Sequence, residues 1–203
     1  MTKNRLEAFS DGVFAIVITL LVIELRPPEL EDGESLAHAL WQLWPNYLAY
    51  LISFAIIGVM WLNHHRMFEQ VRIVDGGLLV LNLNLLLWMA LIPFPTAVVA
   101  DFIRDGGASA RTAVAFYSGV VLLAAISFSA LYAWILHDDR IMGVRLPPEA
   151  VRAARRRFSI GVVFYVVALG LSFVAPWVAL GLHAAMAGYY LFDQASVPSG
   201  EPA

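Results

Sequence analysis

Ionisable and amide side chains interrupt several stretches of this chain that are otherwise apolar. Ser10 and Asp11 open the first such stretch, and His64 and His65 stand near the end of the second. Buried carboxylates, imidazoles and amides persist only when they are paired or hydrogen-bonded. Candidate partners for Ser10 and Asp11 lie near the end of the second stretch, at Trp61, Asn63, His64 and His65, and in the third stretch, at Asn82 and Asn84. We therefore expect a polar cluster of Ser10, Asp11, His64 or His65, and Asn84, which joins the helices that carry these residues.

Such a cluster allows three roles. The plainest is hydrogen bonding between helices with no chemistry of its own. A proton relay through the histidines and a metal site of His and Asp ligands are the sharper alternatives. Adjacent residues point about 100° apart on a helix, so His64 and His65 do not readily bind one ion together. We predict no metal and no other cofactor, and the groups are too few to indicate an enzyme.

The elements that position these groups are predicted to be membrane-spanning helices. Hydrophobic residues make up 60% of the 203 residues and charged residues 14%, and the mean hydropathy is +0.72, which is far too apolar for a soluble domain. Stretches of about 20 apolar residues cross a bilayer, and the chain has six candidates, at 9–25, 43–63, 78–100, 112–136, 158–174 and 177–192. We predict an all-α integral membrane protein with one six-helix domain over 1–192 and a short, disordered cytoplasmic tail over 193–203.

Two prolines, Pro93 and Pro95, fall inside the third predicted span. Proline lacks the backbone N–H and clashes with the preceding turn, so it kinks or interrupts a helix. We expect a bend there, with neighbouring helices satisfying the freed carbonyl groups.

The distribution of lysine and arginine predicts the orientation, because cytoplasmic loops retain these residues. With the N-terminus and the C-terminus inside, the inner segments hold Lys3, Arg5, Arg66, Arg72, Arg140, Arg145, Arg152, Arg155, Arg156 and Arg157. The outer segments hold only Arg26, Arg104 and Arg111. The bias favours cytoplasmic termini, and nothing in the composition suggests a nucleic-acid partner.

One face of the first predicted helix carries a narrow stripe. At about 100° per residue, Ile16, Thr19, Leu20 and Ile23 fall within roughly 100° of one another. Ser10 and Asp11 lie about 130° from the stripe on either side. If the stripe faces an axis shared between subunits, Asp11 points back into its own subunit and needs a partner there.

Three groups of residues in the first half of the chain form motifs, one in each of the first three spans: Arg5, Phe9, Ser10 and Asp11; Trp61, Asn63, His64 and His65; Pro93, Phe94 and Thr96. Together they resemble the motifs of the transmembrane protein 175 family of potassium channels. The resemblance extends over the whole chain in the number of spans. The first motif occurs once, which resembles the bacterial members, where one six-helix unit per chain assembles as a homotetramer.

The resemblance implies that the first helices surround a pore and that hydrophobic side chains after the motif form its constriction. The matching positions are Ile16, Thr19 or Leu20, and Ile23, the same stripe that helical periodicity selects. The family's Arg, Ser and Asp make contacts between helices, which implies that role for Arg5, Ser10 and Asp11. Arg5 fits this role less well, since straight-helix geometry places it near the direction of the stripe.

These observations predict a potassium-permeable cation channel in a prokaryotic plasma membrane, with potassium ions, lipid and further copies of the chain as partners. The chain has no Thr-Val-Gly-Tyr-Gly loop, so a hydrophobic constriction that gates by dewetting is expected, with modest selectivity. We expect Thr19 either to form a polar layer within the stripe or to hydrogen-bond back to its own helix. Proton conduction and ion-coupled transport are the alternatives, although no convincing repeat indicates a transporter.

Overall fold

The described secondary structure is entirely helical. The computed structural model describes residues 1–30, 33–143 and 147–195. Its elements are α1 (Lys3–Leu20), the 3₁₀ helix η1 (Leu21–Glu24), α2 (Leu36–Gln42), α3 (Trp44–Glu69), α4 (Gly76–Leu91), α5 (Pro93–Phe102), α6 (Gly107–Ile135), α7 (Asp139–Met142), α8 (Pro148–Ser172) and α9 (Pro176–Ala195). The six predicted spans coincide largely with these helices, although several spans extend a residue or two past a helix end and several helices begin earlier than the apolar pattern does.

Four helical stretches of the described chain are long and apolar enough to cross a membrane. They are Lys3–Glu24, Trp44–Glu69, Gly76–Phe102 and Gly107–Ile135, and Gly161–Ser172 is a shorter apolar helix. The protein is therefore an all-helical membrane protein with several apolar helices. The count of six spans and the cytoplasmic location of the termini stay predictions.

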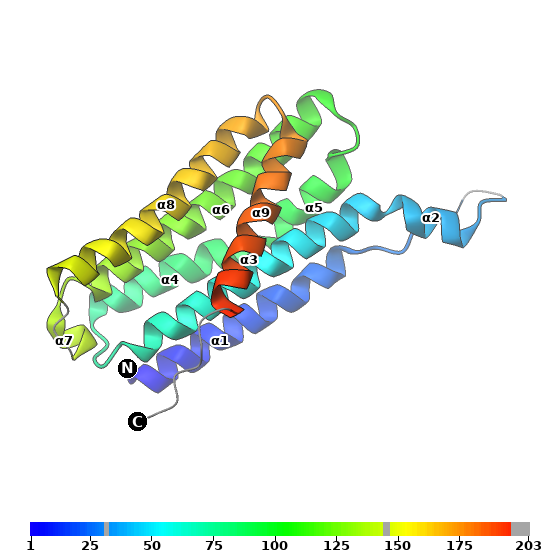
Figure 1. Cartoon of the computed structure of the whole chain (residues 1–203). Helices are drawn as coiled ribbons and strands as arrows, with labels where there is room; N and C mark the ends of the chain where they lie inside the picture. The colour runs from blue at the N-terminus through cyan, green and yellow to red at the C-terminus, as the bar shows by residue number, and fades with distance from the viewer. Residues whose placement is uncertain (31–32, 144–146, 196–203) are drawn as a thin grey trace.

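The α6 helix lies at the centre of the bundle, where it packs against α4, α5, α8 and α9. The α3 helix packs against α5 and α9, and α9 crosses it obliquely (Figure 1). The α1 helix lies at the side of the bundle and packs mainly on α3 and α4. In the most apolar 18-residue segment of Lys3–Glu24, only 28% of the residues are buried, compared with 56% in the corresponding segment of α6. The α1 helix therefore keeps an uncovered apolar face.

The third span breaks where the prolines predict. The α4 helix ends at Leu91, and α5 begins at Pro93. The side chains of Ile92, Pro93 and Pro95 are all buried, so the break lies in protein and not at the lipid surface. This placement lets neighbouring helices shield the interrupted backbone.

The predicted disordered tail overlaps the last helix. The α9 helix continues to Ala195, so residues 193–195 are helical and the tail boundary was placed too early. An apolar pattern ends where the side chains become polar, whereas helical hydrogen bonding continues past that point into the headgroup region. The rest of the predicted tail, 196–203, lies outside the described residues.

Candidate functional site

The α1 helix has two different faces. Its buried face packs on the rest of the chain through Leu6, Ser10, Phe14, Val17 and Leu21, the last of which lies in η1. On the other face, the side chains of Ile16, Leu20 and Ile23 are 60%, 40% and 66% exposed, and Thr19 is exposed as well. The stripe therefore points away from the other helices of its own chain.

The hydroxyl group of Thr19 bonds back to its own helix. Its Oγ1 donates to the carbonyl oxygens of Ile16 at 2.8 Å and Ala15 at 3.0 Å. Because the only hydroxyl proton is directed at the backbone, the remaining lone pairs of Oγ1 act as acceptors. Thr19 thus adds an oxygen acceptor to a stripe that is otherwise hydrocarbon.

A buried chain of hydrogen bonds joins α1, α4 and α3. Ser10 Oγ donates to the carbonyl oxygen of Leu6 at 2.9 Å and accepts from Asn82 Nδ2 at 2.9 Å. The Oδ1 atom of Asn82 lies 2.9 Å from His64 Nε2. Ser10, His64 and Asn82 are at most 1% exposed, so this polar chain is sealed within the protein.

The direction of these bonds follows from counting donors. Ser10 has one hydroxyl proton, which goes to Leu6, so the nitrogen of the Asn82 amide faces Ser10 and its oxygen faces His64. His64 Nε2 then carries a proton and donates it to that oxygen. The chain ends on a backbone carbonyl group, which cannot pass a proton onward. This arrangement favours interhelical bonding over a proton relay.

Asn84 does not join the predicted cluster, which corrects that expectation. Its Nδ2 donates to Ser127 Oγ at 2.7 Å, and Ser127 donates to the carbonyl oxygen of Leu123. Residues two positions apart point about 200° apart on a helix, so Asn82 faces α1 and α3 while Asn84 faces α6. The signal for Asn82 was its spacing from Leu78 and Leu85, which are buried on the same side of α4.

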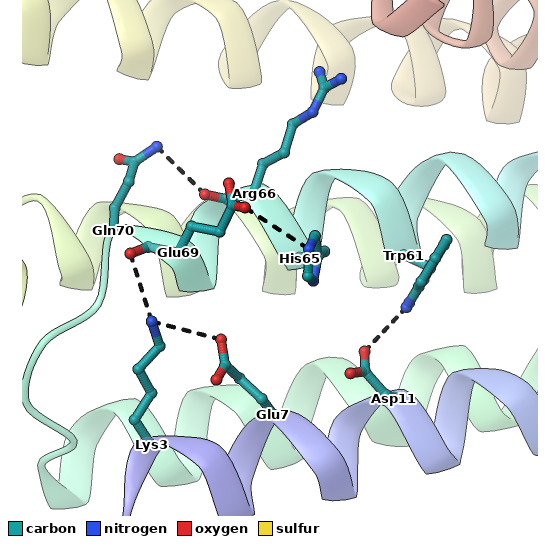
Figure 2. A network of polar contacts seen from close by, with 8 residues as sticks. All are labelled: Lys3, Glu7, Asp11, Trp61, His65, Arg66, Glu69 and Gln70. Carbon is teal, nitrogen blue, oxygen red and sulfur yellow. Dashed lines mark hydrogen bonds and ion pairs between the residues drawn. The ribbon is translucent and has the colours of Figure 1, made fainter. Parts of the chain in front are cut away.

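Asp11 pairs with a tryptophan of the second span. The indole Nε1 of Trp61 donates to Asp11 Oδ1 at 3.0 Å (Figure 2). Both side chains stand at an open groove of about 420 Å³ between α1 and α3, lined by Asp11, Phe14, Ala15, Ile18, Ile57, Gly58 and Trp61. The partner that Asp11 needs therefore comes from its own chain, as the helical geometry predicts.

A ladder of charged groups continues this contact toward the N-terminus of α1 (Figure 2). Lys3 Nζ lies 3.6 Å from Glu7 Oε1 and donates to the carbonyl oxygen of Glu69 at 3.5 Å. His65 Nε2 lies 3.8 Å from Glu69 Oε1. These side chains are partly or well exposed to solvent, where such pairs contribute at most about 1 kcal/mol each. Of these three contacts, the one from Lys3 to Glu69 joins α1 to α3, whereas the other two pairs form within one helix at positions i and i+4.

The two adjacent histidines have separate environments. His64 is buried between the rings of Phe14 and Phe68, whereas His65 is exposed and stacks on Trp61. Among the described residues, no group of three His, Cys, Asp or Glu side chains is placed to hold a metal ion. Arg5 is exposed on the side of α1 that carries the stripe. Asn63 lines a cavity of about 50 Å³ with Ser129, Tyr165 and Tyr190.

Comparisons with known proteins agree with this arrangement. The profile of the family described as endosomal/lysosomal potassium channel TMEM175 matches residues 5–93. A potassium channel of Streptomyces collinus is 43% identical over 201 residues, which cover 99% of this chain and 97% of the relative. The bovine endosomal/lysosomal proton channel TMEM175 is 32% identical over 161 residues, which cover 74% of this chain and 32% of the relative.

A solved structure has the same fold. The crystal structure of a lysosomal potassium-selective channel TMEM175 homolog from Chamaesiphon minutus matches with a TM-score of 0.84 and 39% sequence identity, covering 95% of this chain and 97% of the other. The similarity in sequence and the similarity in fold both extend over nearly the full length of the two proteins. The chain therefore belongs to the TMEM175 family, which consists of membrane ion channels and not of enzymes.

Proposed function

We propose that this chain forms a potassium-permeable cation channel in which four copies place their α1 helices around one axis. The exposed stripe of Ile16, Thr19, Leu20 and Ile23 is the single observation that carries the proposal. A hydrogen-bond acceptor such as Thr19 Oγ1, placed in an exposed apolar stripe, is better accommodated beside a narrow column of water than beside lipid tails. The names of the bacterial relatives, which are potassium channels, support the same assignment.

The constriction works by excluding water. Isoleucine and leucine side chains cannot coordinate a cation, so rings of Ile16, Leu20 and Ile23 form a hydrophobic barrier that conducts only when it widens enough to stay wet. The Thr19 ring between them offers oxygen atoms to an ion that has lost part of its hydration shell. Selectivity for potassium over sodium is accordingly modest.

The polar network holds the pore helix in place. Ser10 and Asp11 fix the back of α1 to Asn82 on α4 and to Trp61 on α3, and these contacts set the rotation of the stripe toward the axis. Lysine and arginine residues concentrate in the loops on the N-terminal side, which supports a cytoplasmic N-terminus in a prokaryotic plasma membrane. Potassium ions enter or leave between the N-terminal turns of α1.

Flux into liposomes tests the proposal. Native protein is expected to pass potassium in preference to sodium. Ile16→Ala widens the constriction and raises the flux, and Ile16→Asn wets it and lowers the preference for potassium. The matched control is Val163→Ala on α8, whose side chain is as exposed as that of Ile16 and whose flux should stay native. The assignment would be overturned if the folded, tetrameric native protein passed neither ion and Ile16→Asn also passed neither.

Proton permeation through the same pore is a second candidate, because the bovine relative is named a proton channel. Water in the pore is the expected route, since the chain from His64 to Ser10 ends on a backbone carbonyl group. His64→Gln keeps a donor for Asn82 and removes the titratable ring. A dye assay in liposomes should therefore show proton flux that responds to Ile16→Asn and not to His64→Gln.

A further inference from the structure

Three hydroxyl groups form a buried chain of hydrogen bonds where the third span breaks. Ser53 Oγ on α3 lies 2.8 Å from Thr96 Oγ1 on α5 and 3.0 Å from the hydroxyl oxygen of Tyr117 on α6. Thr96 Oγ1 donates to the carbonyl oxygen of Ile92 at 2.8 Å. Ser53, Thr96 and Tyr117 are at most 2% exposed. We call these three residues the hydroxyl chain.

Counting protons gives each bond of the hydroxyl chain its direction. Thr96 has one hydroxyl proton, which goes to Ile92, so Thr96 Oγ1 can only accept from Ser53. The one hydroxyl proton of Ser53 is then used, and Tyr117 must donate to Ser53 Oγ. The chain therefore runs from α6 through α3 to α5. Removing the hydroxyl group of Tyr117 detaches α6 and leaves the proton of Ser53 and that of Thr96 with their acceptors.

The hydroxyl chain ends on the residue at which the span breaks. Ile92 separates the end of α4 at Leu91 from the start of α5 at Pro93. Pro93 and Pro95 both lack the N–H that would bond to the preceding turn, so helical hydrogen bonds alone do not fix the angle between α4 and α5. The hydroxyl chain supplies a constraint in their place, because it ties the first turn of α5 to α3 and α6.

The α5 helix in turn packs on the end of the first span. The α4 helix packs on α1, whereas α5 packs on η1 as well as on α1. Leu21 of η1 is buried, and Ile23 in the same turn is exposed. Residues three apart eclipse one another in a 3₁₀ helix, so η1 brings Ile23 more nearly into line with Leu20 than α-helical geometry would. The placement of η1 therefore decides where the last side chain of the stripe points.

We propose that Tyr117 is a positioning residue for the constriction. Through Ser53 and Thr96 it holds α5 in place, and α5 holds η1 so that Ile23 completes the stripe. Tyr117 lies on α6, outside the stripe, and acts on the constriction only through these contacts.

The inference rests on the channel proposed above and divides its stripe into two parts with different supports. Ile16 lies in α1, which packs mainly on α3 and α4, whereas Ile23 lies in η1, which packs on α3 and α5. Loss of the hydroxyl chain should therefore loosen the η1 part of the stripe and leave the α1 part in place.

Thiol labelling tests this difference, because the chain has no cysteine. Ile23→Cys and Ile16→Cys each place one thiol in the stripe. Tyr117→Phe removes one hydrogen-bond donor and keeps the ring, which lies edge-on to His183. A charged methanethiosulfonate reagent applied to the full chain in liposomes should modify Ile23→Cys about fivefold faster in the Tyr117→Phe background, the factor that corresponds to one lost hydrogen bond. The rate at Ile16→Cys should stay native.

Ser118→Ala is the matched control on the same helix. Ser118 follows Tyr117 and is also buried, but its hydroxyl group lies 3.0 Å from Ser172 Oγ and 2.9 Å from His183 Nε2, and not on α3 or α5. It should leave the labelling rate at Ile23→Cys native. An unchanged rate in the Tyr117→Phe background, or an equal rise in the Ser118→Ala background, would overturn the inference.

A second variant breaks the hydroxyl chain at another member. Thr96→Val removes both the acceptor of Ser53 and the bond to Ile92, and it should raise the rate at Ile23→Cys at least as much as Tyr117→Phe does. Thr96→Ser keeps the hydroxyl group and should restore the native rate. If Thr96→Val labels as the native protein does, the hydroxyl chain does not hold η1.

Potassium flux separates this inference from the proposed function. In a conducting native protein, Tyr117→Phe should lower the ratio of potassium to sodium flux, and Ser118→Ala should keep it. A folded native protein that passes no ion while the labelling follows the expected pattern refutes the channel and leaves the support of η1 by Tyr117 standing. A conducting native protein whose labelling and flux ratio do not respond to Tyr117→Phe refutes this inference alone.

Discussion

The indole Nε1 of Trp61 donates a hydrogen bond to Oδ1 of Asp11 at 3.0 Å, and this bond ties α3 to α1 on a side that faces away from the exposed stripe. The two residues belong to separate motifs, 50 positions apart along the chain. Their contact explains how an acidic residue is held on the helix that carries the apolar stripe without lying on the stripe itself. It lies at the edge of a groove and not in a sealed core, so it contributes orientation more than stability.

Trp61→Phe removes the donor and keeps an aromatic ring. Since a hydrogen bond to a partly exposed carboxylate contributes about 1 kcal/mol, we expect a small loss of thermal stability. The ratio of potassium to sodium flux should change more clearly, because α1 can then rotate about its axis. Asp11→Asn keeps an oxygen acceptor for Trp61 and is the matched control. If Trp61→Phe and Asp11→Asn have the same flux ratio as the native protein, the bond does not orient the pore helix.

Asn82 and Asn84 form a matched pair on one helix. Asn82→Ala removes the acceptor of a fully buried imidazole and leaves His64 Nε2–H without a partner, which costs about 1 to 3 kcal/mol. Asn84→Ala breaks a single bond to Ser127, whose hydroxyl group still donates to Leu123, so the loss should be about 0.6 kcal/mol. In detergent, the melting temperature of Asn82→Ala should be well below that of Asn84→Ala. The reverse order would show that the chain from Ser10 to His64 does not join the helices.

Thr19→Val tests the polar layer of the stripe. The hydroxyl group bonds only to its own helix, so replacement by the similarly shaped valine should leave folding and assembly unchanged. If the stripe lines the proposed constriction, potassium flux should fall, because the substitution removes the side-chain oxygen of the stripe. Thr112→Val on α6 is the control, since the hydroxyl group of Thr112 also bonds back, to Ala108 at 2.9 Å. Native flux in Thr19→Val liposomes would mean that threonine oxygens do not meet the ion.

Gly77 lies against the ring of Trp134, where an added Cβ atom would collide with the indole. The indole Nε1 is held by Asp75 at 3.1 Å, and Asp75 also accepts from Leu78 N at the start of α4. The ring therefore cannot move away cheaply, and Gly77→Ala should lower the free energy of unfolding by about 1 to 3 kcal/mol. Gly76→Ala meets open space and should be nearly neutral. Similar melting temperatures for the two variants would contradict this packing.

The periodic features of α1 were predictable because they depend on local geometry. Ile16, Thr19, Leu20 and Ile23 share a face by helical spacing alone, and the structure leaves that face exposed. The break at Pro93 was predictable for the same kind of reason, since a missing backbone donor acts locally. The need of Asp11 for a partner in its own chain followed from its angle to the stripe.

The choice of partner was decided by the tertiary structure. Asn82 and Asn84 are the same residue type in the same helix, and both were candidates for the cluster. Which of them faces α1 depends on the rotation of α4 against two neighbours, because the two side chains point to nearly opposite sides of that helix, about 200° apart. The start of α8 at Pro148 and the end of α9 at Ala195 were also missed, because helical hydrogen bonding can extend beyond either end of an apolar pattern.

Composition and helical periodicity determined by themselves that this is a helical membrane protein whose first span carries a coherent stripe, since both depend on neighbours close along the chain. Only the tertiary structure decided that Ser10 bonds Asn82, that Asp11 bonds Trp61, and that Tyr117 bonds Ser53. Those outcomes depend on how separate helices rotate and pack, and no single helix contains that information.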